Sequence, residues 1–266
     1  MNAVTDFGRK AFTLLELLTV TAILSILAAL LLPALSRAKA YAHSTTCKNH
    51  LRQMGMALKM YAEEHRNKYP YYLGPPGPAY GDAAFPGSPG ERGKGCVFWS
   101  SKLFPYYPLN WTNTAFHCPG YKGAIAGPPA RVLDDGVWRL GSYGYNGQGT
   151  GTHDYTKYFF GLGPCVTWRI PPVSEAQIKM PSEMLAIGDS QFLNAEAGSF
   201  PGGQDTLFIS LDPGHRFDPA RHGRTYNQLW CDGHVAAMSP WVLFDRTKSA
   251  ALWNNDHQPH PETWSP

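Results

Sequence analysis

The clearest pattern in the chain is a predominantly apolar run at positions 12–35. A helix of this length extends about 36 Å, which is enough to cross a hydrocarbon core of about 30 Å. Arg9 and Lys10 precede the run and favour a cytoplasmic amino end, although basic residues on its far side weaken the charge asymmetry. One carboxylate, Glu16, lies inside the run, where a charge is costly, and this makes Glu16 a functional-site hypothesis.

The pattern beyond the run predicts that the same helix continues. Pro33 lacks a backbone donor and is expected to bend or locally unwind the helix near the outer interface of the membrane. The later apolar positions recur at spacings of three and four residues, namely Ala34, Ala38, Tyr41, Leu51, Met54, Leu58 and Tyr61. Charged residues fall on the other side, so this half is predicted to be amphipathic and to pack against a following domain. We expect one helix over 12–67, ending before Pro70.

The remaining chain, 68–266, is predicted to form a loop-rich β head. Residues 70–95 are half Gly and Pro and predict a long loop. A short helix is expected within 97–107. Short strands are expected at 137–140, 142–146, 167–170, 185–189 and 207–210. Together with the long helix, these segments predict an α+β fold.

The clearest hairpin spans 225–238. Its Asp232-Gly233 pair suits a two-residue turn of type I′. Such a turn would place Cys231 opposite His234 and Trp230 opposite Val235. The head is therefore expected to contain an antiparallel sheet.

Composition agrees with this organisation. The 266 residues provide for one membrane segment and one domain of ordinary size. The 27 Gly and 23 Pro beside 13% aromatic residues are typical of a turn-rich β or α+β domain, and the aromatic content argues against disorder. A formal net charge of +3 gives no support to nucleic-acid binding.

The segment Ala11-Phe12-Thr13-Leu14-Leu15-Glu16, preceded by a short basic leader, resembles the cleavage and methylation motif of type IV pilins and type II secretion pseudopilins. The resemblance implies that a prepilin peptidase removes a leader of residues 1–11 and methylates the new amino terminus at Phe12. Glu16 would then be the fifth mature residue, which pairs with the terminal amine of a neighbouring subunit, and Pro33 would occupy a position where many pilins carry proline. Ala11 stands where the family usually has glycine. The apolar run alone also admits a cleaved secretory signal or a permanent signal anchor, but it is longer than the roughly 7 to 15 residues of the apolar core of a signal peptide, and it contains Glu16.

A second resemblance lies near the carboxyl end. His222, nine intervening residues and Asp232-Gly233-His234 resemble the H-X9-DG signature of a group of prepilin-type proteins. No established chemistry accompanies that signature. Together the two resemblances imply a pilin-like α+β fold, in which a long transmembrane and amphipathic helix packs on a loop-rich antiparallel β head.

Several residues of the head have side chains that bind metals. Asp189, His222, Asp232 and His234, with His215, are candidate ligands for a divalent metal, and the loop 212–218 offers oxygen ligands for calcium. No compact metal motif is present, and the plain interpretation is a turn-forming Asp-Gly with a histidine bonded across the loop. Ser190, next to Asp189, is the candidate nucleophile of a hydrolase.

The chain contains five cysteines, so at least one remains unpaired if bridges form within the chain. In a periplasmic head, a Cys47–Cys118 disulfide would tie the first helix to the β region. The alternative is that some cysteines, such as Cys165 and Cys231, are small buried apolar residues.

These observations predict a single-pass subunit of the inner (cytoplasmic) membrane with its head in the periplasm. It would have no enzymatic activity and no required cofactor, and its partners would be the prepilin peptidase and other pilins or pseudopilins in a pilus or pseudopilus. One alternative is a minor tip subunit whose Trp- and Tyr-rich head binds a glycan or a secreted protein. Another is a membrane-anchored metal-dependent hydrolase.

Overall fold

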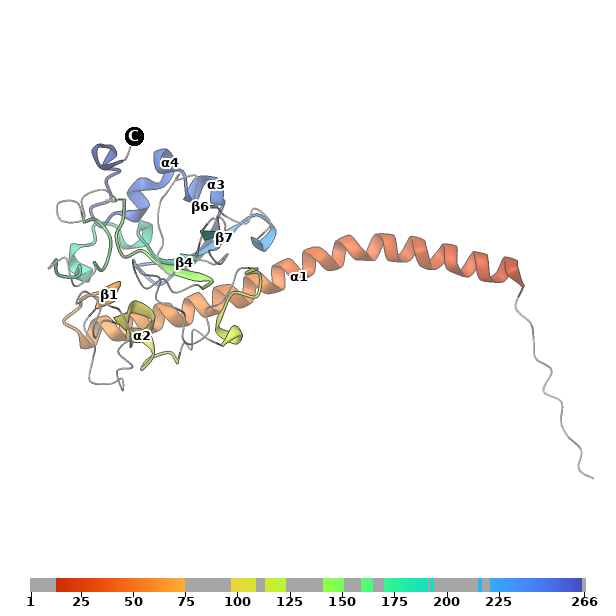
Figure 1. Cartoon of the computed structure of the whole chain (residues 1–266), viewed down its shortest axis with the longest axis horizontal. Coiled ribbons are helices and arrows are strands. Elements are labelled where there is room, and N and C mark those ends of the chain that lie inside the picture. The colour runs from red at the N-terminus through yellow and green to blue at the C-terminus, as the bar shows by residue number, and fades with distance from the viewer. Residues whose placement is uncertain are drawn as a thin grey trace, which may run out of the picture.

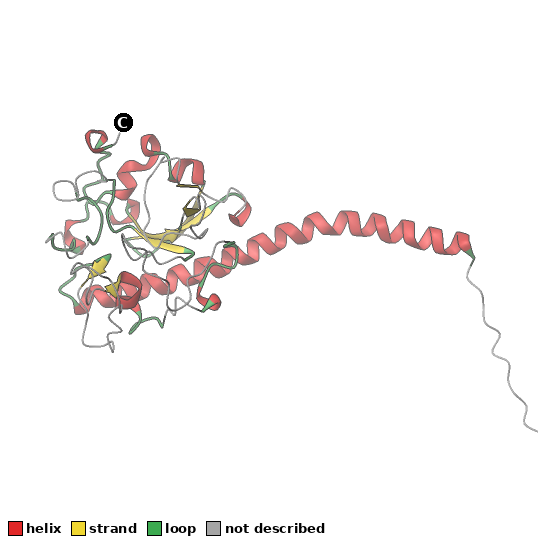
Figure 2. Cartoon of the chain, viewed as in Figure 1, coloured by secondary structure: helices red, strands yellow, loops and turns green. Residues whose placement is uncertain are grey.

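A computed structural model describes residues 13–74, 97–108, 113–122, 141–150, 159–164, 170–190, 192–193, 215–216 and 221–264. These residues form one long helix and a head built around a four-stranded antiparallel sheet (Figures 1 and 2). The arrangement confirms the predicted α+β, pilin-like fold class.

Helix α1 (Leu14–Glu64) contains 51 residues. Its first half projects from the head and its second half lies against it (Figure 1). In the second half the buried positions recur every three or four residues, at Ser44, Cys47, Leu51, Met54, Leu58 and Tyr61. This spacing keeps one stripe of the helix facing the head, as the amphipathic pattern predicts.

The helix is continuous through Pro33. It curves gently along its length rather than breaking at one position (Figure 1). At its far end, the His65 amide donates to the carbonyls of Tyr61 and Ala62. Arg66 and Asn67 then adopt positive φ angles of 60° and 57°, which turn the chain out of the helical path. The helix therefore ends slightly before the predicted boundary.

The main sheet has the strand order β3-β4-β7-β8, and every neighbouring pair is antiparallel. Its strands are β3 (Tyr143–Tyr145), β4 (Leu185–Asp189), β7 (Tyr226–Trp230) and β8 (Val235–Met238). Two smaller two-stranded sheets join β1 (Leu73–Gly74) to β2 (Val97–Phe98) and β5 (Phe192–Leu193) to β6 (His215–Arg216).

The main sheet separates two apolar clusters. On one face, α1 packs with Tyr143, Ile187 and Leu229. On the other face, Leu185 and Trp230 pack with side chains from the carboxyl-terminal helices. Leu185 and Ile187 are two positions apart on β4, so regular alternation would place both side chains on the same face of the sheet. A register shift between them places Leu185 in one cluster and Ile187 in the other.

Short helices complete the head. Helices α3 (Pro240–Leu243) and α4 (Arg246–Ser249) and the 3-10 helix η6 (Ala250–Trp253) cover the face of the sheet away from α1 (Figure 1). Helix α2 (Trp99–Leu103) contacts α1 and falls inside the short helix expected at 97–107. The other 3-10 helices are η1 (Thr114–Phe116), η3 (Glu175–Gln177), η4 (Pro181–Glu183), η5 (Arg221–Gly223) and η7 (Pro261–Thr263).

Strand β4 coincides with the segment predicted at 185–189, and β3 lies within 142–146. The segments predicted at 137–140 and 207–210, most of 167–170 and most of the loop 70–95 lie outside the described residues.

The β7–β8 hairpin has a different turn from the one predicted. Leu229 pairs with Val235, the Trp230 amide donates to the His234 carbonyl at 3.0 Å, and the Gly233 amide donates to the Trp230 carbonyl at 2.9 Å. The loop therefore has three residues rather than two, so Trp230 faces His234 and the predicted register is wrong by one position. Gly233 has a φ of 94°, as expected for a glycine that closes a three-residue loop with a bulge.

We predict that Gly233→Ala lowers the free energy of unfolding by about 1 kcal/mol, because a Cβ disfavours the positive φ of this residue. Urea unfolding of the full chain in detergent, followed by tryptophan fluorescence, measures the change. Gly233→Asn is the matched control. Its free energy of unfolding should fall less than that of Gly233→Ala, because asparagine tolerates the left-handed region better than alanine does. Equal losses in the two variants would contradict the backbone explanation.

Candidate functional site

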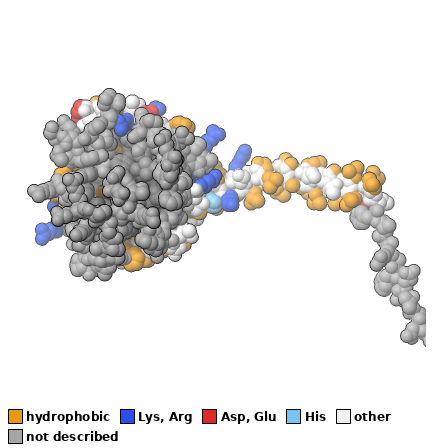
Figure 3. All heavy atoms as spheres, in the orientation of Figure 1, with side chains coloured by type: hydrophobic (Ala, Val, Ile, Leu, Met, Phe, Trp, Pro, Cys, Tyr) orange, Lys and Arg blue, Asp and Glu red, His pale blue; other side chains and the backbone are white. Residues whose placement is uncertain are grey.

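The first half of α1 is an apolar surface without packing partners among the residues that the structure describes. Its thirteen large apolar side chains are exposed, with fractions from 47% for Val20 to 83% for Leu14. Figure 3 shows hydrophobic side chains along the projecting helix, interspersed with backbone and other side chains. The thirteen are Leu14, Leu15, Leu17, Leu18, Val20, Ile23, Leu24, Ile26, Leu27, Leu30, Leu31, Leu32 and Leu35. Among the described residues, α1 is the one helix long and apolar enough to cross a membrane.

Glu16 takes part in capping this helix. The Thr13 amide donates to Glu16 Oε2 at 2.9 Å and the Thr13 hydroxyl donates to the same oxygen at 2.8 Å. In return, the Glu16 amide donates to Thr13 Oγ1 at 3.2 Å. This reciprocal pair is a capping box, which satisfies amide groups that the first turn leaves free. The carboxylate in the apolar run therefore has a local structural role as well as the predicted assembly role.

Two residues of the predicted processing site, Ala11 and Phe12, lie outside the described residues. Pro33 lies on the exposed apolar half of α1.

The head contains a second group of functional side chains, brought together from four segments. Cys47 comes from α1, Cys118 follows η1, Asp189 ends β4 and His222 lies in η5. One ligand-type atom from each lies within 4.8 Å of the other three, and all four residues are buried. We call these four residues the Cys-Asp-His cluster.

Three close contacts define the Cys-Asp-His cluster. Cys47 Sγ lies 3.3 Å from Asp189 Oδ1, and Cys118 Sγ lies 3.0 Å from His222 Nε2. His222 Nε2 lies 3.4 Å from Asp189 Oδ2. The carboxylate and the imidazole are thus in contact with each other and each contacts one thiol.

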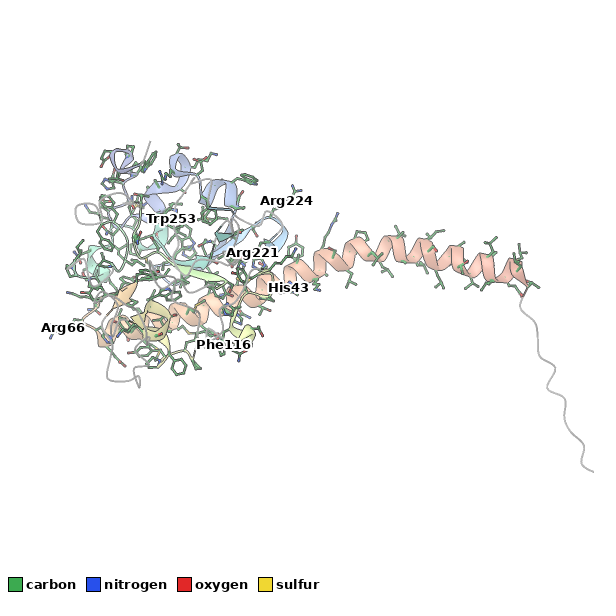
Figure 4. The ribbon with its side chains drawn as sticks, viewed as in Figure 1. His43, Arg66, Phe116, Arg221, Arg224 and Trp253 are labelled. Carbon is green, nitrogen blue, oxygen red and sulfur yellow. The ribbon has the colours of Figure 1, made fainter. Side chains whose placement is uncertain are left out.

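Arg221 closes the cluster on one side. Its Nη2 donates to Asp189 Oδ1 at 2.6 Å and to the Ser142 carbonyl at 2.8 Å. The guanidinium also lies over the rings of Tyr121 and Tyr226, at 5.4 and 5.2 Å from their centroids. Figure 4 places Arg221 inside the head, beside α1. A buried charge is tolerated when it is paired in this way.

The Cys-Asp-His cluster is charged although it is buried. Burial alone would raise the pKa of Asp189, but the Arg221 guanidinium holds that pKa below its ordinary value. Burial would lower the pKa of His222, but hydrogen bonds with Asp189 and Cys118 raise it to about 9. Burial would raise the pKa of Cys118, but the Cys47 thiol and Arg221 lower it to about 5. Burial raises the pKa of Cys47 well above its ordinary value. These shifts favour the charged forms of Asp189, His222 and Cys118 and the neutral thiol of Cys47.

The predicted Cys47–Cys118 disulfide is not formed in the structure. Both residues are free thiols, as is Cys231. The structure nevertheless brings Cys47 and Cys118 together, because the chain after η1 folds back onto α1 at the level of β4. The predicted contact between the helix and the β region is present, whereas the covalent bond remains a prediction.

The predicted metal ligands do not all meet. Asp189 and His222 are in contact, but Asp232 and His234 lie in the β7–β8 turn, at the other end of β7. There His234 Nδ1 lies 2.6 Å from Asp232 Oδ1, and the His234 ring stacks on Trp230. The two ends of the H-X9-DG signature therefore have separate environments, one buried and one exposed.

The other chemical candidates are placed differently. Of the suggested calcium loop 212–218, only His215–Arg216 is described, as β6. Ser190 is buried and its hydroxyl donates to the Gly141 carbonyl at 2.8 Å, which leaves it poorly placed to attack a substrate.

Two contributors were missed in the sequence. The capping box had a visible signal, because Thr13 and Glu16 have the Ser/Thr-x-x-Glu spacing directly before an apolar run. Arg221 had a weaker sequence signal. An aspartate that ends an apolar strand, such as Asp189, requires a buried donor, and Arg221 is next to His222, which was already a candidate metal ligand.

Comparison with known proteins supports an assignment for the amino-terminal segment. Residues 7–32 match the family model described as the prokaryotic N-terminal methylation motif. This match supports a type IV pilin-like prepilin and indicates a structural subunit that is anchored in a membrane. No curated protein and no solved structure matches the chain.

We predict that Asp189→Asn lowers the free energy of unfolding by about 3 to 5 kcal/mol, because it leaves Arg221 buried without its counter-charge. Asp232→Asn removes a half-exposed partner of His234 and should cost less than about 1 kcal/mol. Urea unfolding of the full chain in detergent measures both. Similar losses would contradict the special role of Asp189.

The cost of Asp189→Asn should depend on pH. The folded pKa of Asp189 lies below its unfolded value, so its stabilisation is complete above the unfolded pKa of about 3.9. The stabilisation is lost as pH falls from there through the folded pKa. The difference between wild type and variant should therefore be largest between about pH 4 and pH 6.5 and shrink below about pH 4; it should also shrink as pH rises from about 6.5 towards 9, because Asp189 raises the pKa of His222. A difference that grows as pH falls below about 4 would contradict the ion-pair explanation.

Proposed function

We propose that this protein is a prepilin-type subunit that a prepilin peptidase processes and that assembles with other pilins into a pilus or a type II secretion pseudopilus. The observation that carries the proposal is the exposed apolar half of α1, which coincides with the methylation motif at residues 7–32. In the described part of the head, by contrast, most large apolar residues are buried in two clusters.

The exposed half of α1 requires an apolar environment. Removing one large aliphatic side chain from water is favourable by about 1.5 to 3 kcal/mol, so thirteen of them represent on the order of 20 kcal/mol or more. Lipid supplies that environment before assembly, and the helices of neighbouring subunits supply it in a filament. The small residues Thr19, Ala22, Ser25, Ala28 and Ala29 allow such helices to approach closely.

Glu16 is suited to fix the position of one subunit against the next. Both hydrogen bonds from Thr13 go to Oε2 of Glu16. Among the described contacts, Oε1 accepts no hydrogen bond and is available to a donor from another subunit. Cleavage before Phe12 would create a charged amine, and pairing this amine with Glu16 of a neighbour would neutralise both charges in a low-dielectric environment.

In this proposal residues 1–11 are the leader, 12–67 the anchoring helix and 68–266 the head. The subunit lies in the inner membrane by a single span, with its head in the periplasm. Its partners are the peptidase, the membrane and other pilin-type subunits, and it has no enzymatic activity.

The tip-subunit alternative depends on aromatic residues that are free to bind a glycan or a secreted protein. In the described part of the head, Trp99, Trp230 and Trp253 are buried in the core, Trp264 is half-buried and Trp241 is 64% exposed. Three of these five tryptophans are therefore used in packing, which favours the structural role.

Mass spectrometry of the mature amino terminus tests processing. We expect a chain that begins at N-methylated Phe12 when the full protein is produced together with a prepilin peptidase, and an uncleaved chain when an inactive peptidase is used as the control. A mature chain that begins after residue 35, or cleavage without the peptidase, would contradict the proposal.

Glu16→Ala is predicted to abolish filament incorporation while membrane insertion stays intact, because the variant lacks the carboxylate that pairs with the neighbouring amine. Thr13→Val is the matched control, since it removes the capping hydroxyl but keeps the carboxylate. Incorporation is measured in sheared or cross-linked filament fractions. Normal incorporation of Glu16→Ala, or equal loss in both variants, would refute the pairing argument.

A further inference from the structure

We propose that the Cys-Asp-His cluster is a structural zinc site, in which Cys47, Cys118, Asp189 and His222 are the four ligands. This site lies where the head packs on α1 and does not depend on the proposed function.

The distances fit a tetrahedral ion. Zinc–ligand bonds of about 2.0 to 2.3 Å place neighbouring ligand atoms about 3.3 to 3.8 Å apart. The contact of 3.0 Å between Cys118 and His222 lies close to that range, as do the contacts of Asp189 with Cys47 (Oδ1, 3.3 Å) and with His222 (Oδ2, 3.4 Å). One ligand atom from each of the four residues lies within 4.8 Å of the other three.

The ligand types select zinc among the common divalent ions. Two thiolates, one imidazole and one carboxylate are typical zinc ligands, whereas calcium and magnesium prefer six or more oxygen atoms. All four residues are buried, so the coordination sphere is closed and has no position for a substrate. A closed site of four protein ligands is structural rather than catalytic.

The charges balance around the ion. Two thiolates and the Asp189 carboxylate carry three negative charges, and the zinc ion and Arg221 together carry three positive charges. Arg221 and the Asn227 amide, which donates to Asp189 Oδ2 at 2.8 Å, hold the carboxylate in place from outside the coordination sphere. Such outer hydrogen bonds are usual around metal ligands.

The backbone holds His222 in an unusual conformation. Its φ of 48° and ψ of 34° lie in the left-handed region, which is uncommon for a residue other than glycine. A Cβ on Gly120 would lie 3.1 Å from His222 Cε1, so glycine at this position leaves space for the ring. Backbone strain of this kind is concentrated at functional sites.

A zinc ion here would join α1 to three separate segments of the head. Metal binding of this type contributes directly to folding. The competing fate of the same two sulfurs is a disulfide, which is common in oxidising compartments. The two states exclude each other, because both require the sulfurs of Cys47 and Cys118.

The first test uses the full chain, purified in detergent with a phosphine reductant and without chelators. Inductively coupled plasma mass spectrometry is expected to find one zinc per chain. After zinc is replaced by Co²⁺ alone, the spectrum should show the intense visible bands of tetrahedral cobalt and a thiolate-to-cobalt charge-transfer band. These wild-type readouts do not depend on whether a variant folds.

Variants then assign the ligands. Cys47→Ser, Cys118→Ser and His222→Gln should each lose the bound zinc and the charge-transfer band. Cys231→Ser and His234→Ala should keep both, since these residues lie outside the cluster.

Absence of zinc from the reduced wild-type chain after zinc is supplied would overturn the proposal. A chain that is isolated from cells with a Cys47–Cys118 disulfide and no bound metal would also overturn it. So would a cobalt spectrum of Cys47→Ser that is the same as that of the wild type. Mass spectrometry identifies the disulfide by the loss of two hydrogens. None of these results bears on cleavage before Phe12, so failure of the zinc site and failure of the proposed function are distinguishable.

Discussion

The buried carboxylate of Asp189 is the interaction on which the head depends. It accepts a bond from Arg221 of η5 and one from the Asn227 amide of β7, and it contacts Cys47 of α1. Strand β4, strand β7, a 3-10 helix and the long helix therefore meet at one side chain. Because a buried carboxylate without partners is costly, each of these elements is held in position by the requirement to satisfy it.

Helix α1 combines two environments in one continuous element. Its second half follows the usual rule for a protein core, with a narrow stripe of buried residues facing the sheet. Its first half exposes apolar side chains in every direction, which is stable only in lipid or among other helices. The capping box of Thr13 and Glu16 begins the helix and satisfies amide groups that its first turn leaves free.

Much of this architecture could be predicted from local patterns. The long helix, strand β4 and the β7–β8 hairpin follow from hydrophobic spacing and turn residues, which act over short distances. The register of the hairpin was wrong by one position, because Asp232-Gly233 suits both a two-residue turn and the end of a three-residue turn. The Cys-Asp-His cluster could be predicted only in part. Asp189 with His222 and Cys47 with Cys118 were predicted as two separate pairs, because spacing in the sequence does not show that the segments carrying the two pairs meet at one place.

The continuity of α1 through Pro33 also has a geometric consequence for an assembled structure. An α-helix turns about 100° and advances about 1.5 Å with each residue. The apolar half and the half bound to the sheet belong to one uninterrupted helix, so their relative angle is set by the number of residues between them. The length of that segment therefore sets the angle between the apolar half and the head. Adding one residue would rotate the head by about 100° relative to the apolar half.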